Sequence, residues 1–255
     1  MALADSHCHI DFPEFDADRA AVLAHCRALG IERILVPGVS RATWPRLLAT
    51  CADNAMLRLA LGLHPMFLEE HEEVDPAALE RELDAHPEVV AVGEIGLDFQ
   101  VRGADRQTQL ALCEAQLAIA RDANLPVILH VRKAHEEMLG LLARLRPPGG
   151  IAHAFNGSLQ QAARYRDRGF RFGFGGTLTF DNARHIHDLA RKLPLEDIVL
   201  ETDAPDMSPA AHRGERNSPE YLPEILAALG RLREEDEETL AAATTANLAA
   251  VMGWS

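Results

Sequence analysis

The chain has 255 residues, of which 47% are hydrophobic and 25% are charged, with a formal net charge of −14. This composition is ordinary for a globular protein and excludes a disordered or fibrous one. The acidic balance argues against a protein that coats nucleic acid non-specifically, but it leaves open an enzyme that cleaves a phosphodiester, because bound metal ions can reverse the field locally.

Short apolar runs alternate with longer helix-patterned segments along the whole chain. The runs are rich in Val, Ile and Leu and do not alternate with polar residues, which is typical of parallel strands buried on both faces. Eight such runs are predicted as strands, over residues 2–4, 33–36, 57–61, 89–92, 127–129, 151–152, 170–174 and 198–200. The clearest helical segments are 16–29, 105–123, 158–168 and 219–229, and the acidic run 234–238 opens a final helix.

The order of these elements predicts the fold class. Eight strand-then-helix units in about 250 residues predict an α/β protein with a TIM-type (β/α)8 barrel, which covers residues 1–255 as a single domain. No internal repeat or long Pro/Gly/Ser-rich linker separates a second domain. A doubly wound parallel sheet is the alternative, but His7-Cys8-His9 stands where that fold has a Gly-rich phosphate-binding turn.

Polar residues follow the predicted strands in a regular register. In TIM barrels the catalytic groups lie at the carboxyl ends of the strands. Six of the eight runs are followed there by His, Glu or Asp, namely His7 with His9, His64, Glu94, His130, His153, and Glu201 with Asp203. This register is the strongest functional signal in the sequence.

The pair His7 and His9 is two residues apart. In extended backbone both imidazoles then share one face and can bind one cation, whereas Cys8 points the other way into the core. A His-x-His pair alone is equally compatible with structural or surface histidines. Together with ligand-type residues at other strand ends, it predicts a metal site.

Glu94 ends an otherwise apolar run. A buried carboxylate requires a cation or a proton nearby, and its two oxygens can bridge two metal ions. His130 and His153 are further candidate ligands, although each alone could be a hydrogen-bonded core histidine. His64 is assigned to substrate contact in preference to metal binding, and Asp98 to a structural acceptor.

Asp203 is the candidate general base. A carboxylate at this place can hold a metal ion and accept the proton of the attacking water, so Asp203 and Glu94 form the predicted catalytic pair. Glu201 either orients Asp203 and its neighbours or is structural. Arg132 and Arg213 are assigned to substrate binding; the arginines of the loop 213–217 either hold a phosphate or neutralise nearby acids.

Six sequence blocks together resemble the TatD family of metal-dependent hydrolases and deoxyribonucleases. The blocks are DSHCH at 5–9, GLHP at 62–65, GEIGLD at 93–98, the run 126–130, HAFNG at 153–157 and ETDAP at 201–205. They occur in family order and span nearly the whole chain. One departure is Asn156-Gly157, where Ser or Thr commonly precedes the glycine.

The resemblance implies a TIM barrel with one or two divalent metal ions. It implies that His7, His9, Glu94 and Asp203 bind one ion, and that Glu94 bridges to a second ion held by His130 and His153. It places His64 near the scissile phosphate. Members of the family are described as deoxyribonucleases, often 3′-to-5′ exonucleases.

We therefore expect a divalent-metal-dependent phosphodiesterase or deoxyribonuclease of the 3′–5′ exonuclease type. The ligands allow Zn, Mn, Mg, Co or Ni. The charge of −14 favours DNA or a small phosphodiester bound short or end-on. Four cysteines without a CxxC pair, no apolar run of membrane-spanning length and no signal peptide predict a cytoplasmic protein without membrane association, and we expect no stable protein partner.

Two alternatives remain open. An amidohydrolase that cleaves an amide, ester or aminoacyl bond would keep the metal site; however, many such enzymes bridge their metals with a modified lysine, and no predicted strand ends in Lys. A non-catalytic metal-binding protein would take up metal without turnover.

Overall fold

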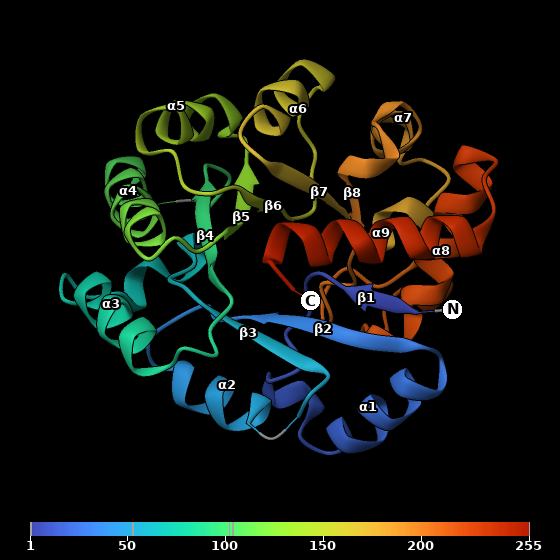
Figure 1. Cartoon of the computed structure of the whole chain (residues 1–255), viewed down its shortest axis with the longest axis horizontal. Coiled ribbons are helices and arrows are strands. Elements are labelled where there is room, and N and C mark those ends of the chain that lie inside the picture. Colours follow the sequence, from blue (N-terminus) through green and yellow to red (C-terminus); the bar gives the residue numbers. More distant parts are fainter. Residues whose placement is uncertain (1, 53, 102, 104, 255) are drawn as a thin grey trace.

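Eight parallel strands form one sheet in the order of the chain. The computed structural model describes residues 2–52, 54–101, 103 and 105–254. The strands are β1 (Leu3–Asp5), β2 (Ile31–Pro37), β3 (Leu57–Leu61), β4 (Ala91–Asp98), β5 (Val127–Arg132), β6 (Gly150–Ala152), β7 (Phe170–Phe174) and β8 (Ile198–Leu200). The Ser6 N–H donates to the Leu200 carbonyl at 2.9 Å, which brings the end of β8 back to β1. The predicted TIM barrel is confirmed (Figure 1).

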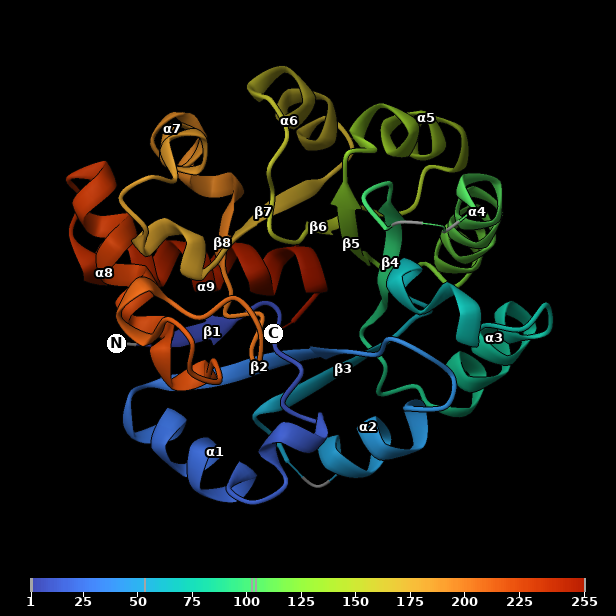
Figure 2. The same cartoon turned by 180° about the vertical axis from the view of Figure 1, so that it is seen from behind.

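Helices surround the strands in both views (Figures 1 and 2). They are α1 (Arg19–Ala28), α2 (Trp44–Cys51), α3 (Asp75–Ala85), α4 (Arg106–Asp122), α5 (His135–Leu145), α6 (Leu159–Arg166), α7 (Arg184–Lys192), α8 (Leu222–Arg233) and α9 (Glu237–Met252). Short 3-10 turns occupy several connections, namely η1 (Pro13–Phe15), η2 (Pro65–Glu70), η3 (Gly176–Thr179), η4 (Leu195–Asp197), η5 (Ala210–His212) and η6 (Pro219–Tyr221).

Local sequence explains where the helices begin. Ser158 forms a capping box with Gln161 at the start of α6, which satisfies two backbone N–H groups that lack helical partners. Asp105 and Asp236 accept N–H bonds from the third residue after each of them, at the starts of α4 and α9. The predicted helix 219–229 needs correction: its first residues form η6, and the helix proper runs over Leu222–Arg233.

The strands β4 and β5 are longer than the sequence predicts. The expected runs 89–92 and 127–129 end before Glu94 and His130, but the structure extends β4 to Asp98 and β5 to Arg132, so both side chains lie within strands. Their polar side chains interrupted the apolar pattern on which the prediction rested. Gly96 permits the close pairing here, because its φ is +150° and a Cβ would overlap the His130 carbonyl.

Apolar side chains fill the barrel interior towards its amino end. One residue from each of seven strands meets two residues of α9, and this cluster contains Ala4, Leu35, Ala60, Ala91, Ile128, Ile151, Val199, Leu248 and Met252. The helix α9 crosses in front of the barrel in Figure 1 and lies behind it in Figure 2, whereas the loops after β8 lie in front in Figure 2. The second apolar layer packs between the strands and the outer helices.

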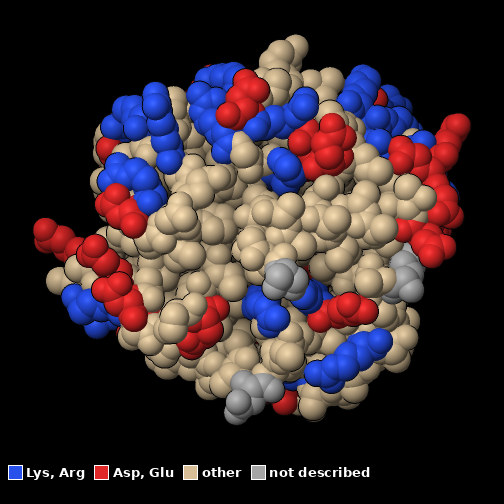
Figure 3. Space-filling view, in the orientation of Figure 1, with Lys and Arg blue, Asp and Glu red and all other residues tan. Residues whose placement is uncertain are grey.

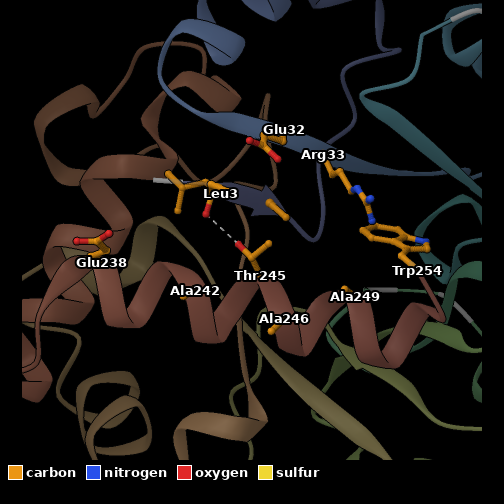
Figure 4. Close-up of a pocket in the computed structure, with 11 residues that line it drawn as sticks. Leu3, Glu32, Arg33, Glu238, Ala242, Thr245, Ala246, Ala249 and Trp254 are labelled. Atoms are coloured by element: carbon orange, nitrogen blue, oxygen red, sulfur yellow. Dashed lines mark hydrogen bonds between the residues drawn. The ribbon is translucent and has the colours of Figure 1, made fainter.

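The face around α9 differs in character from the opposite end of the barrel. Charged side chains of both signs lie around its edge (Figure 3). A pocket of about 450 Å³ opens between α9 and the starts of β1 and β2, lined mainly by alanines with Glu32, Arg33 and Glu238 (Figure 4). The clusters of metal-ligand side chains found among the described residues all lie elsewhere. Within that part of the chain, no helix combines the length and apolarity that a membrane span requires.

Candidate metal centre

A second pocket, of about 530 Å³, lies at the carboxyl end of the barrel and collects most of the predicted site residues. Its lining includes His9, His64, Glu94, His130, Arg132, His153 and Asp203. His7 is fully buried directly beneath them and contacts His9 and Glu94. Donors that are far apart in the sequence therefore meet at the strand ends.

His7 belongs to two sets of possible ligands, one with His9 and Glu94 and one with His153 and Asp203. The Nε2 atom of His7 lies 3.2 Å from His9 Nε2, 3.1 Å from Glu94 Oε2 and 3.6 Å from Asp203 Oδ1. His9 Nε2 lies 3.6 Å from the same Glu94 oxygen and 3.8 Å from the same Asp203 oxygen. Atoms 2.0–2.2 Å from one ion at tetrahedral angles would lie about 3.3–3.6 Å apart. The spacings within His7, His9 and Glu94 therefore fit a common divalent ion, and Asp203 Oδ1 lies within 3.8 Å of both histidines.

The other oxygen of Glu94 faces a second set of imidazoles. Glu94 Oε1 lies 3.2 Å from His64 Nε2 and 3.2 Å from His130 Nδ1. These three side chains place one ligand atom each within 4.8 Å of one another. The two carboxylate oxygens of Glu94 thus address two different groups of nitrogens, which is the arrangement that a bridging ligand requires.

His153 lies on the Asp203 side of the pocket. Its ring stacks on that of His7 with a centroid distance of 3.7 Å, and its Nε2 lies 3.6 Å from Asp203 Oδ2. The ring of His130 is farther away, at 6.4 Å. In the structure, His130 therefore lies with His64 in one set of possible ligands. The expectation that His130 and His153 hold the same ion stays a prediction.

Two buried carboxylates contact the imidazole nitrogens that face away from the ligand atoms. Asp98 Oδ2 lies 3.0 Å from His130 Nε2. Glu201 Oε1 lies 3.0 Å from His153 Nδ1 and accepts the Ala154 N–H at 2.7 Å. Of the two roles considered for Glu201, orientation of a neighbouring side chain agrees with these contacts, and the neighbour is His153.

The backbone at Asp203 is left-handed, with φ of +58°. This region is unusual for residues other than glycine, although aspartate tolerates it better than most. Asn217 fixes the surrounding loop, because its buried amide donates to the Thr202 and Asp206 carbonyls at 2.7 and 2.6 Å. The sequence does not indicate this role of Asn217, because only the arginines of the same loop carry a recognisable chemical signal.

Asp5 joins the ends of β1 and β8. Its carboxylate accepts the His7 N–H at 3.1 Å, the Thr202 N–H at 3.0 Å and the Thr202 hydroxyl at 2.5 Å. The segments that carry His7 and Asp203 are therefore held in a fixed relation to each other. A carboxylate two residues before a His-x-His pair is the only sequence signal for this role.

Two glutamines of α4 hold neighbouring strand ends. Gln116 accepts the Leu63 N–H at 2.8 Å and donates to the Leu63 carbonyl at 3.0 Å. Gln109 makes the same pair of bonds to the backbone of Asp98. Both amides are buried and hold the backbone beside or at a site residue. Neither glutamine is marked by a pattern in the sequence.

Opposing charges set the protonation of the cluster. Burial by itself raises the pKa of Glu94, but the nearby His64 and His7 imidazoles hold it well below its ordinary value. Burial and the neighbouring His153 lower the pKa of His7. Burial lowers the pKa of His64 to about 4. Burial by itself would also lower the pKa of His9, His130 and His153, but the carboxylates that face these rings raise it instead. Neutral imidazoles and ionised carboxylates are the protonation states that bind a metal cation, so a bound ion would displace protons from these three rings.

The three arginines considered for substrate binding have different surroundings. Arg132 lines the pocket and lies 3.7 Å from Asp98. Arg213 is exposed and is not part of the pocket lining. In the same loop Arg216 pairs with both oxygens of Asp18 at 2.8 and 2.7 Å. For Arg216, neutralisation of an acid therefore agrees with the structure.

An α/β barrel with clustered imidazoles and carboxylates at the carboxyl ends of its strands defines the class of metal-dependent barrel hydrolases. The family described as TatD related DNase matches residues 4–253, and the chain belongs to this family.

Individual relatives are similar over nearly their whole length. The chain is 41% identical over 245 residues to the uncharacterized metal-dependent hydrolase YjjV of Escherichia coli K12, with 95% of each chain covered. It is 33% identical over 250 residues to a protein of Klebsiella pneumoniae named 3′-5′ ssDNA/RNA exonuclease TatD, with 94% of each covered. The crystal structure of the Escherichia coli TatD homologue YjjV superposes with a TM-score of 0.95 at 39% identity, and covers 99% of this chain and 98% of the other.

Proposed function

We propose that this protein is a divalent-metal-dependent phosphodiesterase that removes nucleotides from single-stranded DNA ends. The observation that carries the proposal is the approach of Glu94 and Asp203 to the Nε2 atoms of His7 and His9, at spacings of 3.1–3.8 Å. Membership of the TatD related DNase family and the exonuclease name of the Klebsiella relative support the substrate class.

The residues divide into two ligand groups in this proposal. His7, His9, Asp203 and Glu94 Oε2 would hold one ion. Glu94 Oε1 would bridge to a second ion, whose other ligands are His130 and, from the sequence resemblance, His153. Two divalent ions would lower the pKa of the attacking water and neutralise charge on the phosphoryl oxygens. Zn, Mn, Co, Ni and Mg all suit imidazole and carboxylate ligands.

Asp203 would accept the proton of the attacking water. Its side chain is 15% exposed, the largest exposure among the carboxylates of the cluster, whereas Glu94 is 3% exposed. One Asp203 oxygen faces His7 and His9, and the other lies 3.6 Å from His153 Nε2. His64 and Arg132 would contact the phosphate from the rim of the pocket.

The carboxylates behind the histidines would orient them. Asp98 accepts from His130 Nε2, which leaves Nδ1 for the ion, and Glu201 Oε1 lies 3.0 Å from His153 Nδ1, which leaves Nε2. Such carboxylate–histidine pairs fix the tautomer and the ring orientation of a ligand. Asp98 and Glu201 are therefore positioning residues in this proposal.

We place the reaction in the cytoplasm. The four cysteines, Cys8, Cys26, Cys51 and Cys113, are free thiols buried in the protein. Free thiols are typical of a reducing compartment.

The test uses chelator-treated protein that is reloaded separately with Mn, Zn, Mg, Co or Ni. We expect single-stranded DNA to be shortened only after metal is added. Glu94→Gln should abolish most of the activity and reduce the number of bound ions, because it removes the charge of the bridging ligand. Glu114→Gln, a surface carboxylate that pairs with Arg144, is the matched control and should behave like the unmodified protein.

A wider substrate panel separates the alternatives. Lactones, cyclic amides and aminoacyl esters are offered beside single-stranded DNA and small phosphodiesters. Turnover of an amide or ester without turnover of DNA would identify an amidohydrolase and contradict the proposal. Tight metal binding without turnover of any of these substrates would identify a metal-binding protein.

A further inference from the structure

Apolar side chains surround the opening of the metal-site pocket. Phe12, Met66, Phe67, Ile186 and Met207 all line it, and we refer to these five residues as the apolar mouth. They come from the connections after β1, β3 and β8 and from α7. The charged ligand cluster lies in the same pocket, so one ligand can touch both regions.

Two side chains of the apolar mouth are exposed to solvent. Met66 is 54% exposed and Met207 is 38% exposed. In the part of the chain that the structure describes, five large apolar side chains are at least 36% exposed, and two of the five line this pocket. Clustered exposed apolar side chains at a cleft are typical of a binding surface.

Aromatic rings of the apolar mouth pack directly against ligand imidazoles. The ring of Phe12 is nearly parallel to that of His9, with centroids 4.6 Å apart and an interplanar angle of 24°. The ring of Phe67 meets that of His64 edge-on at 5.9 Å. An apolar group bound at the mouth would therefore lie next to a phosphate bound at the ligand cluster.

The charges of the pocket do not supply a grip on a long phosphate backbone. Among the described residues of its lining, Arg132 is the single lysine or arginine, while Glu94, Asp203 and Asp206 are acidic. The chain as a whole carries a net charge of −14. Apart from the phosphate held by the proposed ions, affinity for a nucleic acid then has to come from contacts with its bases.

Building on the proposed function, we propose that the apolar mouth binds a nucleobase of a single-stranded DNA end, next to the phosphate that is cleaved. Every base offers a flat apolar face to such a surface, so binding needs no particular sequence. In a duplex this face is covered by stacked and paired neighbours. The apolar mouth thus selects single-stranded ends that carry bases.

The test compares two double variants with matched exposure. The mouth pair is Met66→Ser with Met207→Ser, and the control pair is Val74→Ser with Leu159→Ser. Val74 and Leu159 are 53% and 38% exposed and lie outside the pocket lining. Thermal unfolding of all proteins is measured first, to establish that both pairs fold.

The substrates are two single strands that differ only at the end that is cleaved. One ends in ordinary nucleotides, and in the other the last two nucleotides are replaced by propanediol phosphate, which keeps the phosphates and removes the bases. With Mn-loaded protein we expect kcat/KM to be about 5- to 50-fold higher for the nucleotide end. The mouth pair should reduce this ratio to about twofold or less, and the control pair should preserve it.

Binding gives a readout that does not depend on turnover. Both pairs are introduced into Asp203→Asn protein, and the anisotropy of a labelled single strand is measured. The mouth pair should weaken binding several-fold, and the control pair should not. The slope of log affinity against log salt should be about −0.7 to −1.4, the value for one or two neutralised phosphates of a single strand.

The outcomes separate this inference from the proposed function. Cleavage of both ends with equal efficiency, a mouth pair that behaves like the control pair, or a salt slope beyond about −3 would overturn the inference and leave the phosphodiesterase intact. Failure of the Mn-loaded protein to cleave either strand would overturn the proposed function and the inference with it.

Discussion

The two ends of the same barrel are built for different tasks. At the amino end, one apolar side chain from each of seven strands packs against Leu248 and Met252 of α9. At the carboxyl end, imidazoles and carboxylates in or directly after six of these strands lie largely buried within 3–4 Å of one another. Apolar burial stabilises the fold, whereas buried charged groups cost free energy unless a partner compensates them. The residues that stabilise the fold and the candidate metal ligands therefore lie largely at opposite ends of the barrel.

The largest effect that would sharpen this contrast is expected at Asp203. Asp203→Asn should lower kcat by about 10²–10⁴-fold, the range for loss of a general base. In chelator-treated protein it should lower the free energy of unfolding by about 2 kcal/mol or less, because its contacts with His7 and His9 are long, at 3.6 and 3.8 Å. Steady-state kinetics and urea unfolding measure the two quantities. Asp188→Asn, an exposed surface change, is the control.

The reverse effect is expected at the amino end. Leu248 is fully buried in the barrel interior, so Leu248→Ala should lower the free energy of unfolding by about 2–5 kcal/mol. The number of metal ions bound per folded protein should not change. Urea unfolding and metal analysis of the folded fraction check both statements. A large loss of bound metal without loss of stability would contradict the separation of the two ends.

A smaller effect is expected behind the ligands. Glu201→Gln keeps an oxygen acceptor for the Ala154 N–H but removes the charge facing His153 Nδ1. Metal affinity should fall by about 10–100-fold. Calorimetric titration with metal measures this change, and thermal unfolding of the chelator-treated protein shows whether Glu201 is merely structural. If stability falls while metal affinity is unchanged, the positioning role is wrong.

The smallest expected effect concerns pH. Burial lowers the pKa of His135, which contacts the Tyr165 hydroxyl and Asn156 at the carboxyl end and is surrounded by Phe155 and Glu136. The unfolded chain therefore binds the proton more readily, so stability contributed here is present above pH 6.5 and is lost as the pH falls below it. His135→Gln should lose less stability than the unmodified protein between pH 7 and pH 5. Parallel urea titrations at both pH values test the difference.

The repeating elements of the fold were predictable because they depend on local patterns. Strands β3, β7 and β8 match their predicted bounds, since each is a short apolar run with clear ends. Gly30 and Gly169 have φ of +83° and +80°, as expected for helix ends. Strands β4 and β5 were predicted too short because Glu94 and His130 lie inside them. A functional side chain within a strand breaks the pattern by which the strand is recognised.

The site was predictable to the level of its candidate ligands. Residue type and strand register indicated Glu94 and the histidines, whereas Gln109, Gln116 and Asn217 act through backbone bonds to residues distant in sequence. No local pattern marks such a contact. The assignment of each ligand to an ion, and the single-domain organisation, stay predictions.

Gly173 on β7 gives one more consequence of this architecture. A Cβ at this position would overlap the carboxylate of Glu201 on the neighbouring strand. Glu201 in turn faces His153 at the end of β6. The glycine therefore leaves the space that the Glu201 carboxylate occupies, and engineering of this barrel for another metal must preserve that space. Alanine at residue 173 would displace the carboxylate of Glu201, which follows β8, from the imidazole of His153, which follows β6. A substitution outside the set of candidate ligands would therefore change the surroundings of one of them.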